Sequence, residues 1–284
     1  MSTPFVTRFA PSPSGFLHRG HAYSALKASE AAREAQGRFL LRIEDIDTAR
    51  CRQPFEEAIY EDLAWLGLEW EEPVRRQSDH LAEYGAALED LRERGLLYRC
   101  FRTRKDVLEE IARAPHGHVE PFRAGPLSDK EEEPLLAEDR AYAWRLSLPA
   151  ARKAASGFTH LAFMEEGEGP DGETGLIRAH PEALGDVVLG RKDLGVSYHL
   201  AVVVDDAAQG ITHVVRGEDL FEAAHIQRLL QELLGLPTPT YRHHRLLVGA
   251  DGQRYAKRDR AETLREIRAR GVTAQELRAE LGFQ

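Results

Sequence analysis

The sequence contains only two cysteines, Cys51 and Cys100, among 284 residues. Two cysteines are too few for a disulfide framework or for an all-cysteine zinc site, so we expect both to be reduced. No apolar run approaches the length of about 20 residues that a membrane helix requires. The N-terminus also lacks the basic region and apolar stretch of a secretion signal. These absences exclude a helical membrane protein and predict a cytoplasmic location.

The chain is also short of positive charge, with a formal net charge of −9. Taken alone, this charge argues against a nucleic-acid partner, because polyanion binding uses surface Lys and Arg. Basic residues nevertheless gather in Arg92–Lys105 and Arg242–Arg270, and acidic residues in Asp129–Asp139. Such clusters are either solvated helix faces or local binding faces.

Strand and helix signals alternate in the first part of the chain, which predicts a parallel sheet. We expect strands at 5–10 and 38–43, and helices at 18–36, 55–68 and 78–94. The alternation resumes after residue 185. There we expect strands at 186–189, 198–204 and 211–215, a further segment of the core at 241–248, and helices at 220–234, 261–269 and 273–281.

Between these two parts lies a stretch rich in Gly and Pro that contains the acidic cluster. We expect a helix at 103–114 and strands at 141–148 and 158–164 within this insertion. The sequence therefore predicts a core in two halves, 1–95 and 185–248, around an insertion at 96–184. A loop and short C-terminal helices follow at 249–284.

The loop Pro11–Gly15 leads into a helix whose first turn contains His18 and His21. A helix N-terminus favours phosphate through its free N–H groups and its dipole. At spacing i, i+3 the two imidazoles share a helix face, and each can donate a hydrogen bond to a phosphate undergoing displacement. Gly20 leaves room for a flat base. The alternative is a capped surface helix that happens to contain two histidines.

Three blocks resemble glutamyl-tRNA synthetases and their relatives. Residues 8–21, RFAPSPSGFLHRGH, resemble the HIGH-signature region, and residues 41–50 are similar to the LRIEDTD segment. Residues 198–220 resemble the segment that ends in VVRGEDL. The resemblance implies the α/β fold of class I aminoacyl-tRNA synthetases: a Rossmann-like parallel sheet, split by an α+β insertion and followed by short C-terminal helices.

The resemblance also implies a pocket for L-glutamate. Arg8 and Arg216 supply the cations for its carboxylates, because guanidinium pairs with carboxylate through two hydrogen bonds. Glu44 holds the ammonium, Ser12 adds a hydroxyl or backbone contact, and Tyr198 closes the pocket. Each arginine alone would as readily be a surface ion pair.

A KMSKS-type loop is the second ATP motif of this class, and residues 254–258, RYAKR, occupy its place in degraded form. Lys257 stands where the family has a lysine that contacts the ATP phosphates, so the implied ATP site comprises His18, Gly20, His21 and Lys257. His18, His21 and Lys257 are the predicted catalytic residues. Magnesium is expected to bind through ATP without an obvious protein ligand, and Asp205 and Asp206 are interpreted as the end of a strand.

Family members that charge tRNA continue into an anticodon-binding domain, which we expect to be absent here. The length resembles a truncated paralogue that attaches glutamate to queuosine in the anticodon loop of tRNA(Asp), and the apolar Val202 agrees with that subfamily. The expected partners are L-glutamate, ATP and the queuosine-bearing anticodon stem-loop, with a monomeric protein and no membrane. The alternatives are a truncated core that acts on the 3′ end of tRNA(Glu) and a non-catalytic RNA-binding paralogue.

Many members of that subfamily have a zinc site in the insertion. Here Cys100, His116 and His118 are irregularly spaced, and structural zinc requires four ligands. We therefore expect neither zinc nor any other protein-bound metal.

Overall fold

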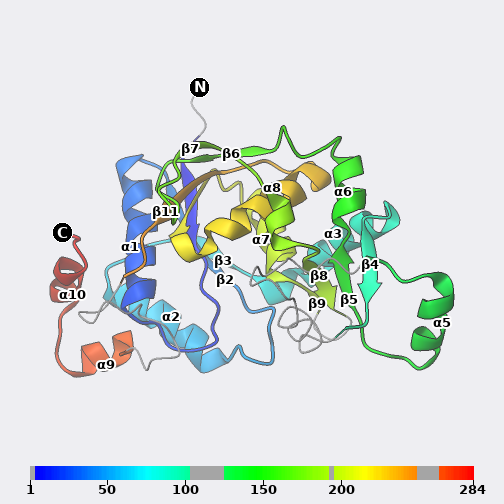
Figure 1. Ribbon diagram of the computed structural model, residues 1–284. Coiled ribbons are helices and arrows are strands. Elements are labelled where there is room, and N and C mark those ends of the chain that lie inside the picture. The colour runs from blue at the N-terminus through cyan, green and yellow to red at the C-terminus, as the bar shows by residue number, and fades with distance from the viewer. Residues whose placement is uncertain (1–3, 103–124, 192–194, 248–261) are drawn as a thin grey trace, which may run out of the picture.

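The computed structural model describes residues 4–102, 125–191, 195–247 and 262–284 (Figure 1). Its N-terminal sheet contains three parallel strands in the order β1-β2-β3: β1 (Val6–Phe9), β2 (Arg38–Ile43) and β3 (Glu71–Arg76). The helices α1 (Arg19–Glu34) and α2 (Gln53–Trp65) connect these strands. The predicted parallel alternation is therefore confirmed, although β3 was not expected.

A second set of strands continues beside β1, where the backbone N–H of Thr212 donates to the carbonyl of Val6 at 2.9 Å. It contains β10 (His213–Gly217) and β11 (Thr240–His244), which are parallel and joined by α8 (Phe221–Leu234). Next come β6 (Ala162–Glu165), parallel to β11, and β7 (Gly175–Arg178), antiparallel to β6. The core thus joins strands from distant parts of the chain.

A separate antiparallel sheet lies at the other end of the molecule from α1 (Figure 1). Its order is β4 (Leu97–Cys100), β5 (Ala143–Leu146), β8 (Val188–Arg191) and β9 (Gly195–Val196). The helices α5 (Asp129–Ala137) and α6 (Leu148–Ala154) belong to the same part of the chain. Strand pairing crosses the predicted boundaries, because β6 and β7 join the core sheet while β8 and β9 join this one. The helix expected at 103–114 lies outside the described residues.

The strand predicted at 198–204 is wrong, because this segment forms α7 (Tyr198–Ala208). The residues Leu200, Ala201, Val202 and Val203 are all buried. A continuous apolar run is compatible with either a buried strand or a buried helix, and here the run is surrounded by protein on several sides. Asp205 and Asp206 are therefore buried positions within a helix and do not end a strand.

The remaining elements complete the two ends of the core. The 3-10 helix η1 (Gln77–His80) precedes α3 (Leu81–Glu93), and η2 (Pro181–Leu184) and η3 (Glu218–Leu220) are similar short turns. The C-terminal helices α9 (Leu264–Ala269) and α10 (Ala274–Glu280) share a hydrophobic cluster with α1. Among the described residues, no helix is long and apolar enough to cross a membrane.

Candidate functional site

The first turn of α1 brings the two predicted histidines together. His18 is the N-cap residue, and its Nδ1 accepts the backbone N–H of Gly20 at 3.1 Å. The Nδ1 of His21 accepts the backbone N–H of His18 at 3.2 Å, and the ring centroids are 3.8 Å apart. Because both Nδ1 atoms are acceptors, a neutral imidazole at either position has its proton on Nε2. Both rings therefore retain an N–H donor of the kind that a phosphate oxygen requires.

The segment before α9 is attached to this same turn. Thr263 forms an isolated backbone bridge with His18, and the N–H of Leu264 donates to the carbonyl of Leu17 at 2.8 Å. The guanidinium of Arg19 forms ion pairs with Glu262 at 2.9 Å and with Glu280 at 2.8 Å. The C-terminal helices are thus bonded to the first turn of α1, where ATP is predicted to bind. Lys257 lies outside the described residues, and its role stays a prediction.

A cavity of 220 Å³ brings together three of the residues predicted to bind glutamate. Ser12 reaches it from the loop after β1, Glu44 from the end of β2 and Tyr198 from the start of α7. Its other lining residues were not predicted from the sequence: Ile46, Asp47, Arg50, Gln77, Arg191, Val196 and Ser197. The loop after β1 is joined to the end of β2 by a hydrogen bond from the Glu44 N–H to the Pro11 carbonyl at 3.0 Å.

Glu44 belongs to a buried network of charged side chains. Arg42, with no exposed surface, donates to Glu44 Oε1 at 3.1 Å and to Asp206 Oδ1 at 2.7 Å. The Nε of Arg8 donates to the same Asp206 oxygen at 3.0 Å. Burial raises the pKa of the Glu44 carboxyl, and the Arg42 and Arg8 guanidiniums offset only part of this rise. An ammonium beside Glu44 would therefore favour its ionised form.

Arg216 is not among the residues that line this cavity. It is 6% exposed and donates to His243 Nε2 at 3.0 Å, to Gln227 Oε1 at 2.9 Å and to the Leu220 carbonyl at 2.9 Å. One of its terminal nitrogens is 3.5 Å from the Tyr198 hydroxyl. Arg8, also outside the lining, is linked to the Glu44 network through Asp206. Neither predicted arginine lines this cavity, but Arg216 contacts its lining residue Tyr198, and Arg8 is linked to Glu44 through Asp206 and Arg42.

The sequence did not identify the buried side chains that hydrogen-bond to Glu44 and to the two arginines. The main ones are Arg42, Asp206 and His243. Arg42 gave a usable signal, because an arginine stands within the apolar strand Phe39-Leu40-Leu41-Arg42-Ile43. A charge in such a strand must find a buried partner. The partner, Asp206, is 164 residues away in the sequence, so no local pattern could identify it.

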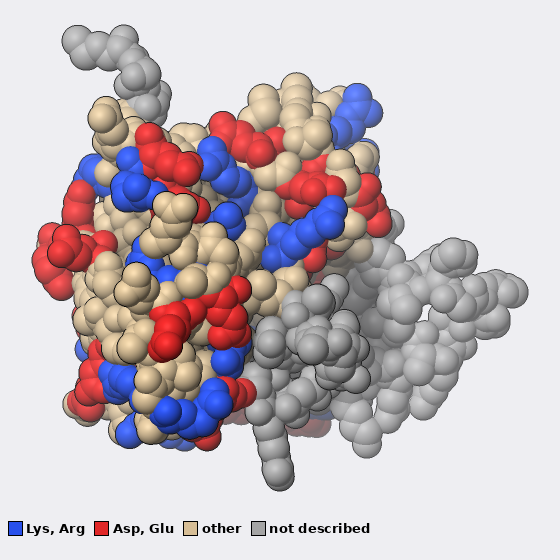
Figure 2. Space-filling model, turned by 90° about the vertical axis from the view of Figure 1, so that its left-hand side faces the viewer, with Lys and Arg blue, Asp and Glu red and all other residues tan. Residues whose placement is uncertain are grey.

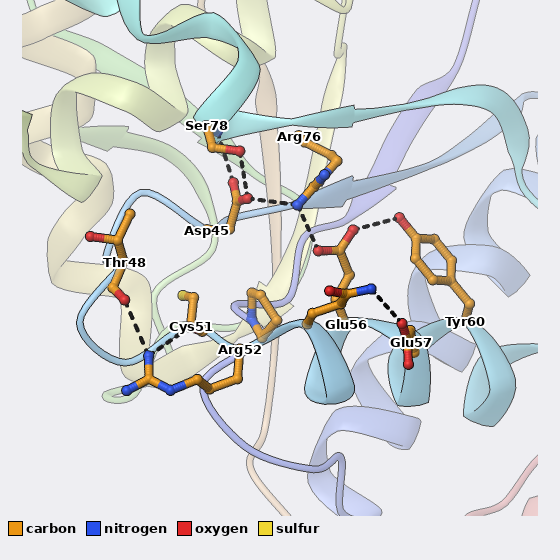
Figure 3. Close-up of a pocket in the computed structure, with 11 residues that line it drawn as sticks. Asp45, Thr48, Cys51, Arg52, Glu56, Glu57, Tyr60, Arg76 and Ser78 are labelled. Carbon is orange, nitrogen blue, oxygen red and sulfur yellow. Dashed lines mark hydrogen bonds and ion pairs between the residues drawn. The ribbon is translucent and has the colours of Figure 1, made fainter.

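A larger cavity of 520 Å³ lies on the other side of the segment 44–52 (Figure 3). Glu44, Ile46, Asp47 and Arg50 line the first cavity, whereas Asp45, Thr48, Cys51 and Arg52 line the second. In the second cavity Asp45 accepts from the N–H and hydroxyl of Ser78 at 2.8 and 2.6 Å. Arg76 bridges Asp45 and Glu56 at 3.3 and 2.9 Å. These hydrogen bonds hold Asp45, the neighbour of Glu44, against Ser78 and Arg76.

The described residues contain no group of three or more His, Cys, Asp or Glu side chains that could hold a metal ion. Cys51 and Cys100 do not form a disulfide, and Cys100 is buried in β4. His116 and His118 lie outside the described residues, so the expectation that no zinc binds stays a prediction.

Acidic partners compensate much of the charge in the two basic clusters. Arg92, Arg94 and Arg99 pair with Glu89, Asp90 and Glu132, and Arg242, Arg245, Arg268 and Arg270 pair with Glu166, Glu168, Glu61 and Glu262. Figure 2 shows both signs of charge interspersed on the face that carries α1 and the C-terminal helices. An RNA phosphate at either cluster would therefore compete with these carboxylates.

A family model described as "tRNA synthetases class I (E and Q), catalytic domain" matches residues 4–281. The chain belongs to this family. Membership makes the protein an enzyme of the aminoacyl-tRNA ligase type and implies the use of ATP. It also confirms the predicted α/β fold class.

Two relatives match over nearly all of this chain. A Rhodobacter capsulatus protein named Glutamyl-Q tRNA(Asp) synthetase is 47% identical over 292 residues, which cover 98% of this chain and 100% of that protein. A Symbiobacterium thermophilum protein of the same name is 41% identical, with 97% and 85% covered.

A crystal structure of a glutamate tRNA ligase from Elizabethkingia meningosepticum, in complex with its amino acid, has a TM-score of 0.73 and 29% identity. The match covers 90% of this chain and 52% of that one, so the chain spans about half the length of the solved ligase.

Proposed function

We propose that the protein activates L-glutamate with ATP and transfers it to a hydroxyl on the cyclopentenediol of queuosine in the anticodon loop of tRNA(Asp). The observation that carries this proposal is the 47% identity, over 98% of this chain and the whole of the relative, to a protein named Glutamyl-Q tRNA(Asp) synthetase. The cavity that joins Ser12, Glu44 and Tyr198 supports the glutamate half of the reaction.

The reaction has two displacements. The glutamate α-carboxylate attacks the α-phosphorus of ATP in line, and pyrophosphate leaves. A queuosine hydroxyl then attacks the carbonyl of the glutamyl-adenylate, and AMP leaves. No covalent enzyme intermediate is needed, so catalysis consists of positioning and of charge stabilisation.

Each predicted residue has a role in this scheme. Glu44 holds the ammonium, Arg8 and Arg216 balance the two carboxylates, and Ser12 and Tyr198 complete the pocket. His18, His21 and Lys257 contact the ATP phosphates, and the base packs at Gly20. Mg²⁺ enters with ATP as a phosphate-bound ion.

We further propose that adenylation needs no tRNA and that the protein acts as a monomer. Every candidate group for glutamate belongs to this chain, so binding of the amino acid requires no group from a tRNA or from a second subunit.

The second candidate is transfer to the 3′ end of tRNA(Glu). A Jannaschia protein named Glutamate--tRNA ligase 2 is 37% identical over 95% of this chain, which supports this alternative. That match covers 58% of the Jannaschia protein, whereas the Rhodobacter match covers 98% of this chain and 100% of that protein. The fuller match favours the queuosine reaction.

The first test is glutamate-dependent exchange of labelled pyrophosphate into ATP, with magnesium present and tRNA absent. We expect exchange with glutamate and none when the amino acid is omitted. Absence of exchange with glutamate would contradict tRNA-independent activation.

The acceptor is tested with labelled glutamate, ATP and tRNA(Asp) that either contains or lacks queuosine, with tRNA(Glu) as a third substrate. We expect label only on the queuosine-containing tRNA(Asp), and nuclease digestion should locate it in the anticodon fragment. Label at the 3′ end of tRNA(Glu) would support the second candidate instead.

A further inference from the structure

Three buried groups on neighbouring parallel strands form a chain of hydrogen bonds that ends at Arg216. Glu165 is the last residue of β6, His243 lies in β11 and Arg216 in β10. Their exposed fractions are 1%, 2% and 6%. The carboxylate Oε2 of Glu165 is 2.5 Å from His243 Nδ1, and Arg216 Nε is 3.0 Å from His243 Nε2.

The donors and acceptors in this chain fix the tautomer of His243. Arg216 can only donate, so His243 Nε2 must be the acceptor and therefore lacks a proton. The proton of a neutral ring is then on Nδ1, where it is donated to the Glu165 carboxylate. Burial and the Arg216 guanidinium lower the pKa of His243, against the Glu165 hydrogen bond, which agrees with a neutral ring.

The other carboxylate oxygen of Glu165 is held by the backbone. Oε1 accepts the N–H of His243 at 2.9 Å and the N–H of Gly167 at 2.7 Å. A Cβ at position 167 would lie 2.0 Å from the His243 carbonyl oxygen, so this close approach requires glycine. The direction in which Glu165 presents its second oxygen to the imidazole is therefore fixed.

We propose that Glu165 and His243 are positioning residues, which set the rotation of the Arg216 guanidinium and so its readiness to bind a glutamate carboxylate. With Nε held by His243, one terminal nitrogen is directed to the Leu220 carbonyl and the other to Gln227 and the Tyr198 hydroxyl. Tyr198 lines the glutamate cavity, so the relay extends from the core to the substrate site. The inference rests on the proposed use of glutamate.

The decisive variant is Glu165→Gln. It preserves the volume of the side chain and reverses the direction of the hydrogen bond between residue 165 and His243 Nδ1. The amide oxygen must take the position that accepts the two backbone N–H groups, so the amide nitrogen faces His243 Nδ1. The proton of the imidazole then moves to Nε2. This N–H group faces the Arg216 Nε–H, so two donors meet and their hydrogen bond is lost. We expect the KM for glutamate in pyrophosphate exchange to rise about tenfold, since a hydrogen bond to a charged group is lost.

A merely structural role would affect all kinetic constants, whereas the relay should leave kcat and the KM for ATP within about twofold of wild type, since it acts on one substrate's binding. Glu166→Gln is the matched control. Its carboxylate forms a surface ion pair with Arg242 at 2.8 Å and lies outside the relay. An unchanged KM for glutamate in Glu165→Gln, or an equal rise in Glu166→Gln, would overturn the proposal.

Two substitutions of His243 separate the two ends of the relay. In His243→Gln the amide oxygen can stand near the position of Nε2 and accept from Arg216, whereas His243→Asn can donate to Glu165 but cannot reach Arg216. We expect Gln to retain more glutamate affinity than Asn at comparable thermal stability. Equal loss of affinity, or the reverse order, would contradict a role through Arg216.

The tautomer can be measured without activity. The ¹⁵N shifts of His243 should show a protonated Nδ1 and a bare Nε2 in the wild type, and the reverse in Glu165→Gln. A wild-type ring protonated on Nε2 would refute the relay, whatever the enzyme does. Failure of wild-type pyrophosphate exchange together with the expected shifts would instead refute the proposed function and with it the role of the relay in glutamate binding.

Discussion

At the scale of the residue, Asp206 is the centre of the charge balance behind the site. It receives hydrogen bonds from Arg8 and Arg42, both of which are nearly inaccessible to solvent. Burial raises the pKa of the Asp206 carboxyl, but the two guanidiniums outweigh that effect and hold its pKa below the usual value of 3.8. Removing this one charge would leave two buried cations without their common partner.

Asp206→Asn should therefore lower the free energy of unfolding by about 3–5 kcal/mol, the usual cost of breaking a buried ion pair. Chemical denaturation at pH 7 measures this loss. The matched control is Asp139→Asn, a substitution at an exposed position. A loss no greater than that of the control would contradict the balancing role of Asp206.

The same carboxylate predicts an acid dependence. Because its pKa is lower in the folded than in the unfolded state, its contribution is present above about pH 4 and disappears as the pH falls through the folded pKa. The free energy of unfolding of Asp206→Asn should decline less steeply below pH 4 than that of the wild type. Glu44 titrates in the same network, so the relevant quantity is the difference between the two proteins. Parallel curves would contradict the assignment.

Site residues could be predicted from the sequence where they belong to a short motif. They could not be predicted where their position in the site depends on contacts between distant parts of the chain. Ser12, Glu44 and Tyr198 were predicted by resemblance and do meet at one cavity, although their roles stay proposals. Arg216 was predicted to bind a carboxylate, which stays a proposal, and the structure adds the protein partners that hold its guanidinium. Those partners belong to other strands and helices, and no spacing rule relates them to Arg216.

At the scale of the element, one side chain at the start of α1, His18, has two roles. His18 caps the helix through Nδ1 and, in the proposed mechanism, donates to phosphate through Nε2. These roles can be separated, because asparagine is a good N-cap residue and has no equivalent of the Nε2–H group.

His18→Asn should keep the free energy of unfolding within about 0.5 kcal/mol of wild type, whereas His18→Ala should lose about 1 kcal/mol with the cap. Both should lower kcat for pyrophosphate exchange about 100-fold or more, because a donor to the transition state is removed. Denaturation and exchange kinetics on the three proteins provide the comparison. Retained activity in His18→Asn would show that capping is the sole role.

The helix α1, which is buried on one side, was predicted well, whereas α7, which is buried on several sides, was not. The helix α1 was expected from its polar and apolar faces, and it begins and ends within two residues of the expected bounds. In α7 the buried residues Leu200 to Val203 follow one another without a polar residue between them. The spacing of apolar residues therefore could not distinguish a helix from a strand. The neighbours that favour a helix there, α3 and α8, are defined only by the fold.

At the scale of the whole molecule, the core consists of two hydrophobic clusters. One contains residues of α1, β2, α2 and the C-terminal helices, and the other contains residues of the second sheet, α7 and α8. Leu277 of α10 belongs to the first and Leu230 of α8 to the second, and neither has any exposed surface. The first cluster therefore supports the turn that contains the two histidines.

Leu277→Ala and Leu230→Ala form a matched pair, each expected to cost about 2–5 kcal/mol as a buried leucine truncation. In pyrophosphate exchange, Leu277→Ala should raise the KM for ATP more than Leu230→Ala does, because α10 is fastened to Arg19 beside the histidines. Equal effects on the KM for ATP at equal loss of stability would mean that the C-terminal helices have no specific link to the nucleotide end.

The ion pairs of Arg8 and Arg19 also determine when the site can exist. Asp206 follows Arg8 by 198 residues and Glu280 follows Arg19 by 261. At a synthesis rate of about 5–20 residues per second, Asp206 is added about 10–40 s after Arg8. During that interval the nascent strand β1 contains a guanidinium without its partner. The growing chain thus cannot complete the charge network beside its glutamate pocket before Asp206 has been added, or the ion pair at its nucleotide end before Glu280 has been added.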